Sequence, residues 1–545
     1  MRPLPKLTPE NEFFWTAGAD GELRFQYCGT CDRYLHPPGV VCSRCGGVPG
    51  VRPVSGRATV VGFTVNHQPW LPDMKVPYVI GLVAIEEDPL VRLTTLIVDA
   101  DPDHVVIGLP VAVRFEQHDD VWLPVFAPTD EPASGVVEYP EPSPAPVRPM
   151  AVAEKFESRV AITGIGMSEV GRRLGRHPMS LAMDACRAAV ADAGLTMDDI
   201  DGLSTYPGGG ARDGGHSEGG IYPVADSLGI HPTWFCGTME TPGQSGAVVN
   251  AMLAVAAGLC RHVLCFRTVW ETTSIAWGNR RNSGVDGGAR VSGDMEWRLP
   301  YGAMSAGNWI ALMAGHYLHR YGATREQLGW IPVTARAGAA HNPSAIYQAP
   351  LTIDDYLDAR MITTPFGLFD CDVPCDGSTA LVVSAVETAH DRPHRPVLVE
   401  AVGTQMRERM SWDQGTLLHE PMVDGPSGHL WSRTDLKPED VDVALLYDGF
   451  SFNALSWLEA LGFCGRGEGA AFVEGGTRIA RDGEIPLNPH GGQLSAGRLH
   501  GYGFLHEAVV QLRGHGGGRQ VDAAEVVVAT TGGGHPGGAF LFVGG

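Results

Sequence analysis

The chain of 545 residues has no long uninterrupted apolar segment. A helix that crosses a bilayer needs roughly 18 or more apolar residues in a row, and no run here approaches that length. The first residues, MRPLP, lead into charged and aromatic positions, whereas a signal peptide would continue into an apolar core. We therefore expect a cytoplasmic protein without a membrane span.

Positive charge is also scarce, since 40 Lys and Arg stand against 62 Asp and Glu, a formal net charge of -22. Proteins that bind nucleic acid neutralise phosphates with clustered Lys and Arg. We expect no nucleic-acid partner, and an anionic ligand would need a locally basic pocket. The remaining composition is that of an ordinary globular protein, with 44% hydrophobic residues.

The cysteines do not form the framework of a disulfide-rich secreted protein, because only four of the eleven form a pattern. Cys28, Cys31, Cys42 and Cys45 make two Cys-x-x-Cys pairs, the spacing of a tetrahedral structural zinc site. A redox dithiol is the alternative, but it needs only one pair. Four thiolates leave no position for water, so the zinc should stabilise and not catalyse.

The N-terminal part of the chain divides into three regions. Residues 1–54 hold a short helix and turn followed by the cysteine pairs of a zinc ribbon. Five β-rich runs within 55–128 predict an OB-like barrel. Residues 129–158 are rich in proline and predict a semi-rigid linker. The five runs are 58–64, 78–85, 90–97, 111–117 and 121–126.

The ribbon and the barrel together resemble a small acyl-CoA-associated family that accompanies thiolase-like enzymes. The resemblance covers nearly all of residues 10–130. It implies that this part of the chain docks the coenzyme A portion of an acyl-CoA substrate.

Residues 159–545 show two similar α/β halves, about 159–393 and 394–545. The strand pattern at 159–166, followed by a helix at 178–193, is echoed by the glycine-ended strand at 395–403. Strands that alternate with helices in two such halves predict a layered α/β fold with two stacked, parallel-rich sheets.

The segment 488–501, NPHGGQLSAGRLHG, concentrates glycine with two histidines and an arginine. Glycine permits positive φ and close backbone approach, while His and Arg supply proton donors and an anion clamp. The plainer interpretation is a tight turn before the helix at 504–512, with the histidines capping it.

Four separate motifs between residue 159 and the end resemble those of the thiolase superfamily. They are Asp376–Ala380, Tyr447–Phe450, the segment 488–501 and the glycine-rich loop 530–539. The resemblance implies a duplicated five-layered thiolase-like fold, an acyl-CoA substrate and a homodimer formed through this domain.

The residues of the thiolase reaction are missing. A condensing thiolase uses a nucleophilic cysteine at a helix start. Gly243 stands at that position, Thr530 replaces the second cysteine, and Arg498 replaces the histidine of the Gly-His-Pro motif. Ser245 belongs to the Ser-Gly of the motif and has no evident base. We expect no acyl-enzyme.

This pattern of losses resembles the lipid-transfer-protein type thiolase-like aldolases of steroid side-chain degradation. That family shares Tyr447 and the segment His490–Ser495 but has a second tyrosine where this chain has Arg498. Its members work with a zinc-ribbon and OB-fold partner, which here is fused to the N-terminus. The resemblance implies retro-aldol cleavage of a β-hydroxyacyl-CoA.

Such a cleavage needs one base, one proton donor and an oxyanion hole for the thioester enolate. Tyr447 and His500 are candidates for the proton transfers, with Arg498 as an aid that lowers the pKa of Tyr447 or binds a carbonyl or phosphate. Asp448 is a candidate orienter. The candidates for holding the enolate oxygen or the coenzyme A portion are His490, His535, Gly243, Ser245 and Gly533.

Each candidate has a purely structural alternative. Tyr447 could end a buried strand, His535 could be a turn residue, and Arg498 could be an ordinary salt-bridge partner. The segment 270–309, rich in Trp and Arg, lines a substrate tunnel or packs a subunit interface. Alternative functions are a cysteine-free condensing or decarboxylating enzyme, and a non-catalytic acyl-CoA or lipid carrier.

Overall fold

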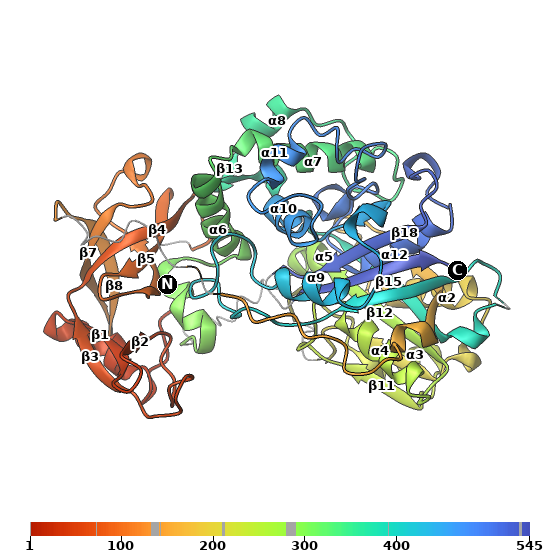
Figure 1. Cartoon of the computed structure of the whole chain (residues 1–545), viewed down its shortest axis with the longest axis horizontal. Coiled ribbons are helices and arrows are strands. Elements are labelled where there is room, and N and C mark those ends of the chain that lie inside the picture. The colour runs from red at the N-terminus through yellow and green to blue at the C-terminus, as the bar shows by residue number, and fades with distance from the viewer. Residues whose placement is uncertain are drawn as a thin grey trace.

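The computed structural model describes residues 2–71, 74–131, 141, 143–209, 213–278, 290–390, 392–533 and 537–545. A smaller β-rich region built from the N-terminal part of the chain lies beside a larger α/β region (Figure 1). Helix α6 (Ala306–Tyr321) lies where the two regions meet. His535 falls outside the described residues.

The ribbon is a three-stranded antiparallel sheet in the order β2-β1-β3. Helix α1 carries Trp15, which is fully buried and stacks on Trp297 of the larger region at 4.8 Å. The ribbon is thereby anchored to the α/β region by aromatic packing. The elements are α1 (Glu12–Thr16), β1 (Leu23–Cys28), β2 (Arg33–Leu35) and β3 (Gly50–Val54).

The barrel that follows confirms all five predicted strands. Antiparallel pairing runs from β4 through β5 to β6, and from β7 to β8, while pairing of β4 with β7 closes the barrel. The strands are β4 (Arg57–Asn66), β5 (Tyr78–Ile85), β6 (Asp88–Ile97), β7 (Pro110–His118) and β8 (Val121–Pro128).

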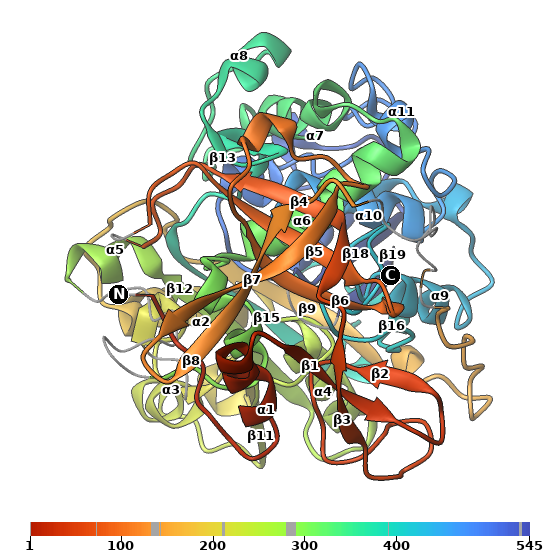
Figure 2. The same ribbon diagram turned by 90° about the vertical axis from the view of Figure 1, so that its left-hand side faces the viewer.

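Two short strands of the larger region, β13 (Met361–Thr363) and β14 (Phe366–Gly367), extend the barrel sheet at β4. The hydroxyls of Thr64 and Thr363 lie 2.6 Å apart, and the backbone N–H of Val65 donates to the hydroxyl of Thr364 at 2.8 Å. Figure 2 shows the barrel in front of the α/β region, with α6 behind β4. We call this junction the barrel seam.

The larger region is built on a nine-stranded sheet in the order β11-β10-β12-β15-β9-β16-β19-β18-β17. Figure 1 shows helices on both sides of these strands, as expected for a layered α/β fold. The strands are β9 (Val160–Met167), β10 (Gly202–Thr205), β11 (Trp234–Gly237), β12 (His262–Trp270), β15 (Asp376–Ala385), β16 (Val397–Gly403), β17 (Val443–Leu445), β18 (Val526–Thr531) and β19 (Gly538–Gly544).

The expectation of two separate, parallel-rich sheets is wrong. Within the described part of the nine-stranded sheet, the pairs β10–β11, β10–β12 and β17–β18 are parallel and the other neighbours run antiparallel. The halves join where β9 pairs with β16 through Ile162 with Val397 and Ala161 with Leu398. Antiparallel neighbours arise because β15 and β19, the closing strand of each half, run against the strands on both sides of them.

The helices predicted at 178–193 and 504–512 are confirmed as α2 and α12 with small changes of bounds. No helix among the described residues is both long and apolar enough to cross a membrane. The helices are α2 (Pro178–Asp192), α3 (Ile221–Leu228), α4 (Gly246–Ala256), α5 (Glu271–Ala276), α7 (Arg325–Ala339), α8 (Ile353–Asp358), α9 (Asp424–Trp431), α10 (Ser451–Ala460), α11 (Gly469–Val473) and α12 (Tyr502–Leu512), with a π-helical turn η12 (Gly492–Ala496).

Candidate functional site

The site begins at the carboxyl ends of β17 and β18. These strands are parallel, so both end at the same edge of the sheet. Tyr447 and Asp448 follow β17, and Gly533 follows β18. The backbone N–H of Tyr447 donates to the Thr530 hydroxyl at 2.9 Å, which fixes the two loops against each other. The Thr530 hydroxyl therefore has a structural role as the acceptor of this hydrogen bond.

The Tyr447 ring packs against the backbone of Gly533. A Cβ at residue 533 would lie 2.2 Å from the Tyr447 ring, and Gly533 has a φ of +95°. Both the space and the backbone conformation require glycine there. The structure thus brings two sequence-predicted site residues into contact.

Burial raises the pKa of Tyr447 well above its ordinary value, and Asp372 adds to that effect. The side chain of Gln493 and the guanidinium of Arg498 lower the pKa, but by less. Arg498 therefore lowers the pKa of the phenol, as expected, but burial outweighs its effect. The Tyr447 phenol stays protonated at neutral pH and has a proton to give.

Asp448 is completely enclosed and orients the segment 488–501. Its carboxylate accepts the backbone N–H of Gln493 at 2.7 Å and the side-chain amide of Asn488 at 3.0 Å. Burial raises its pKa to about 7, which these hydrogen bonds oppose. The contacts of Asp448 thus go to the loop that carries the other candidates.

Arg498 lies between two acids. Its guanidinium pairs with Asp372 at 3.1 Å and with Glu271. Burial lowers the pKa of Arg498, but Asp372 and Glu271 outweigh burial and raise it. Arg498 thus forms salt bridges, as the structural alternative for this residue predicted. The same guanidinium also lowers the pKa of the Tyr447 phenol.

His500 lies near Glu271, the acid that also pairs with Arg498. Its Nδ1 lies 2.5 Å from Nη2 of Arg267, and its Nε2 lies 3.9 Å from Oε1 of Glu271. The imidazole of His216 stacks on that of His500 with centroids 5.5 Å apart, and Nδ1 of His216 lies 3.5 Å from Glu271. We call these residues, with Arg498 and Asp372, the Glu271 cluster.

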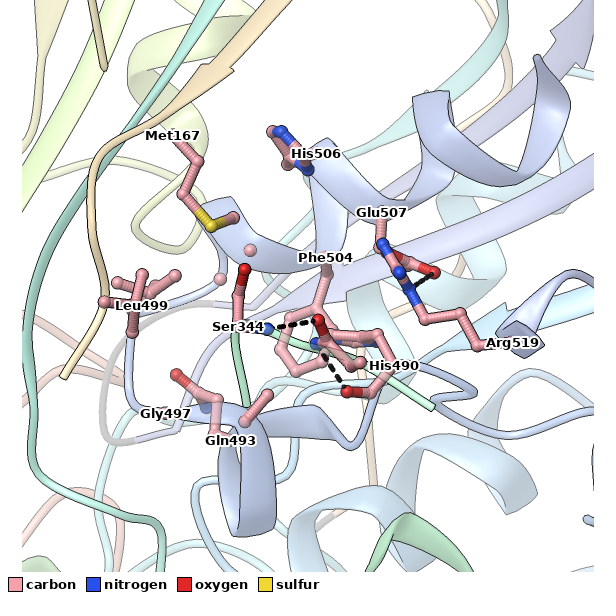
Figure 3. A pocket seen from close by; sticks show the side chains of 15 residues that line it. Met167, Ser344, His490, Gln493, Gly497, Leu499, Phe504, His506, Glu507 and Arg519 are labelled. Atoms are coloured by element: carbon pink, nitrogen blue, oxygen red, sulfur yellow. Dashed lines mark hydrogen bonds and ion pairs between the residues drawn. The ribbon is translucent and has the colours of Figure 1, made fainter. Parts of the chain in front are cut away.

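His490 lines a small cavity of about 130 Å³ with Gln493, Phe504 and Arg519 (Figure 3). Its ring meets Phe504 edge-on at 5.5 Å, and its Nδ1 is buried without a hydrogen-bond partner among the described residues. Burial lowers the pKa of His490 to about 3, helped by Arg519. His490 is therefore a neutral imidazole at neutral pH.

Gly243 and Ser245 contact Thr531, the last residue of β18. A Cβ at residue 243 would lie 2.3 Å from the Thr531 hydroxyl, and Gly243 has a φ of +66°. The Ser245 hydroxyl is fully buried and lies 2.6 Å from the same hydroxyl. The space beside the Cα of Gly243 is thus occupied by the Thr531 side chain.

Two other thiols come near the site. Burial raises the pKa of Cys375 and of Cys371 well above the ordinary value, and Arg498, which lowers both, does so by less. A thiol in that state is a poor nucleophile. Neither belongs to a metal-ligand cluster among the described residues.

The four ribbon cysteines converge as a zinc site requires. The sulfurs of Cys28 and Cys45 are 3.5 Å apart, those of Cys31 and Cys42 are 3.9 Å apart, and all four lie within 4.8 Å of one another. Zinc–sulfur bonds of about 2.3 Å in a tetrahedron place the sulfurs about 3.8 Å apart. Backbone N–H groups of Arg44 and Cys45 lower the pKa of Cys42 to about 6, which favours a thiolate.

Sequence reasoning missed four residues of the site: Glu271, Asp372, Arg267 and His216. One signal was available for Arg267 and Glu271. Arg267 interrupts the apolar strand HVLCFRTVW, and Glu271 follows that strand directly. A charge within a buried strand needs a partner, so Arg267 pointed to a buried polar cluster. Nothing local marked His216 or Asp372.

Three family descriptions match the chain. "ChsH2, rubredoxin-like zinc ribbon domain" matches residues 15–49, and "ChsH2, C-terminal OB-fold domain" matches residues 51–116. "Thiolase C-terminal domain-like" matches residues 427–543. The chain thus combines two N-terminal modules of one family with a thiolase-like region.

Curated relatives cover the larger region. A "steroid side-chain-cleaving aldolase" of Thermomonospora curvata is 36% identical over 384 residues, which are 69% of this chain and 95% of the relative. A "17-hydroxy-3-oxo-4-pregnene-20-carboxyl-CoA lyase" of Mycobacterium tuberculosis is 34% identical over 392 residues, 70% of this chain and 98% of the relative.

Among solved structures, an "Ltp2-ChsH2(DUF35) aldolase" aligns with a TM-score of 0.63 at 34% identity and covers 71% of this chain and 98% of the other. An acetyl-CoA acetyltransferase of Syntrophomonas wolfei aligns with a TM-score of 0.51 at 16% identity, covering 71% of this chain and 99% of the other. The α/β region has the thiolase-like fold.

Proposed function

Because this chain belongs to the family of thiolase-like steroid side-chain-cleaving aldolases, we propose that it cleaves a β-hydroxyacyl-CoA by a retro-aldol reaction without a covalent cysteine intermediate. The observation that carries the proposal is the ion-pair network of Arg498 with Glu271 and Asp372, together with a buried Tyr447 phenol whose pKa Asp372 raises and Arg498 lowers, at a site where Thr531 occupies the space beside Gly243.

The reaction balances with groups that the site contains. A carboxylate of the Glu271 cluster, Glu271 or Asp372, takes the proton of the β-hydroxyl. The Cα–Cβ bond then breaks, giving a ketone and a thioester enolate whose charge is held by hydrogen-bond donors. The Tyr447 phenol gives a proton to Cα, which releases a shorter acyl-CoA, and the proton taken from the β-hydroxyl then restores the phenol, so that the site ends in its starting state. No bond to the protein forms at any stage.

The relatives' names indicate the substrate class. One is named for a pregnene-carboxyl-CoA bearing a 17-hydroxyl, which is a β-hydroxyacyl thioester with a tertiary alcohol. We propose the same class here, an acyl-CoA of steroid side-chain type. Coenzyme A enters only as part of that substrate, and the ribbon and barrel dock it. The ribbon cysteines Cys28, Cys31, Cys42 and Cys45 hold a structural zinc.

We also propose a homodimer through the thiolase-like region. The edge strand β11 has no further strand on its outer side among the described residues. Around it Phe235 is 48% exposed and Tyr222 is 71% exposed, with their rings 5.6 Å apart. An unpaired edge beside exposed aromatic side chains is a surface that a second copy would cover.

The substrate proposal is tested by incubating the purified protein with tertiary β-hydroxyacyl-CoAs, among them a steroid side-chain thioester, and identifying products by mass spectrometry. We expect a ketone together with acetyl-CoA or propionyl-CoA. The matched analogues that lack the β-hydroxyl should remain intact. Hydroxylated thioesters that co-purify uncleaved would contradict the proposal and favour an acyl-CoA carrier.

A further inference from the structure

We propose that Arg267 holds His500 as a neutral imidazole with its proton on Nε2, so that His500 donates a hydrogen bond to the thioester oxyanion and is not the base. This inference rests on the proposed retro-aldol function and assigns the roles within its site. Arg267 is then a positioning residue, which acts through His500.

Arg267 is fixed in place. It lies in the middle of β12, is 2% exposed, and has Nη1 within reach of three backbone carbonyls. They are those of Tyr206 at 3.2 Å, Thr268 at 3.3 Å and His216. With Nη1 held in this way, the guanidinium has one orientation, and that orientation directs Nη2 at Nδ1 of His500, 2.5 Å away.

The chemistry of the pair determines the tautomer. A guanidinium has five N–H donors and no acceptor, so His500 Nδ1 must accept with its lone pair. A neutral imidazole that accepts at Nδ1 carries its proton on Nε2. Protonating Nδ1 as well would set two N–H groups against each other beside a buried cation. His500 is therefore a poor proton acceptor and a good neutral donor.

The donor end of the ring faces the reacting centre. Nε2 lies 3.9 Å from Glu271 Oε1, and Glu271 pairs with Arg498, which acts on Tyr447. The His500 side chain is 14% exposed, and the stacked His216 imidazole covers one of its faces. His500 holds a φ of +49°, so the loop keeps the ring here despite a backbone conformation that disfavours most side chains.

The same atoms suggest a metal site, which the tautomer argues against. His216, Glu271 and His500 offer three ligand atoms within 4.8 Å of one another. A metal bound at His500 Nε2 would need the lone pair there, whereas the contact with Arg267 leaves a proton on Nε2. Arg267 and Arg498 would also repel the ion. We therefore assign the trio to hydrogen bonding.

Three substitutions of His500 distinguish a hydrogen-bond donor from a base. The amide nitrogen of Gln reaches the place of Nε2, whereas that of Asn reaches only the place of Nδ1. We expect His500→Gln to keep kcat within about tenfold of the wild type, and His500→Asn and His500→Ala to lose roughly 100-fold or more. His319→Gln, on the exposed end of α6, is the control for the chemistry of the substitution.

Differences in folding stability cannot explain a higher kcat for His500→Gln than for His500→Asn. Asn tolerates positive φ better than Gln, so His500→Asn should be at least as stable in thermal unfolding as His500→Gln while being less active. Equal losses for Gln and Ala in folded protein would overturn the donor role. Arg267→Lys, which keeps the charge but not the fork, should lower kcat while leaving KM within about twofold.

An independent measurement reads the tautomer directly. In protein labelled with ¹⁵N-imidazole histidine, the His500 signal, assigned by its loss in His500→Gln, should show a protonated Nε2 and an unprotonated Nδ1. A proton on Nδ1, or on both nitrogens near pH 7, would overturn the inference. Because this spectrum needs no turnover, absence of any cleavage would count against the proposed function and leave the tautomer assignment standing on the spectrum.

Discussion

At the scale of single residues, the proposed reaction depends most on Tyr447. Because burial keeps its pKa raised, the phenol is a proton donor throughout the neutral and mildly alkaline range. Tyr447→Phe removes that proton, so we expect kcat to fall roughly 10²- to 10³-fold with little change in KM. Steady-state kinetics on a β-hydroxyacyl-CoA measures both constants. Tyr321→Phe, at the end of α6, is the matched control.

The sign of the pKa shift adds a pH prediction. Ionisation of Tyr447 would abolish the donor only above its raised pKa, so wild-type kcat should not decline on account of this group between about pH 7 and 9.5. A fall with an apparent pKa near 9 that disappears in Tyr447→Phe would mean that the phenol ionises there, against the burial argument.

Cys375 tests whether any thiol takes part. Burial keeps its pKa raised, so we expect Cys375→Ala to retain at least half of the wild-type kcat. The measurement is the same kinetic assay, combined with intact-protein mass spectrometry during turnover. Loss of activity by 100-fold in a folded variant, or an acyl mass that is absent from Cys375→Ala, would show a covalent role.

The sequence predicted part of this site, for physical reasons that differ from residue to residue. Tyr447, Arg498 and His500 lie in glycine-rich loops with motif spacing, so local pattern was sufficient to nominate them. Glu271, the first residue of α5, and Asp372 lie far along the chain from 488–501, and only the folded sheet brings them to Arg498. His535 stays a prediction, since it lies outside the described residues.

At the scale of elements, the ribbon should depend on its metal. Its strands β1, β2 and β3 carry few buried apolar side chains, so metal ligation replaces part of a core. We expect about one zinc per chain by elemental analysis, and less in Cys42→Ser. Chelation should make the ribbon sensitive to trypsin at Arg33, Arg44 and Arg52. A ribbon equally resistant without metal would contradict the structural role.

The barrel seam yields a second prediction at this scale. Asn308 of α6 is fully buried and donates to Asn66 and Thr363, both at 3.0 Å. Asn308→Leu removes one buried hydrogen bond from each of those acceptors, which costs on the order of 1–3 kcal/mol. We expect calorimetry to show a thermal transition several degrees lower. Asn342→Leu is a different case, because it removes the amide that donates to the backbone carbonyl of His490. An unchanged transition would show that the seam contributes little.

The elements show what pattern alone can predict. The β-rich runs predicted all five strands of the barrel, because the residue pattern of a strand lies within the strand itself. The pairing of β13 with β4 joins segments about 300 residues apart and has no local signal. The antiparallel neighbours in the large sheet were missed for the same reason, since apolar strands do not reveal their direction.

At the scale of the whole molecule, the proposed dimer can be broken at its edge. Phe235→Glu places a charge on the exposed side of β11. We expect a shift from dimer to monomer by light scattering, while Val41→Glu on the exposed ribbon surface should leave the dimer intact. A wild-type protein that is monomeric at micromolar concentration would contradict the dimer.

The most direct test of the central claim is the product stoichiometry without added coenzyme A. A retro-aldol cleavage needs no second substrate, so each β-hydroxyacyl-CoA consumed should give one ketone and one shorter acyl-CoA by quantitative mass spectrometry. A thiolase-type cleavage would need free coenzyme A as acceptor. If products form only after coenzyme A is added, the retro-aldol account is contradicted.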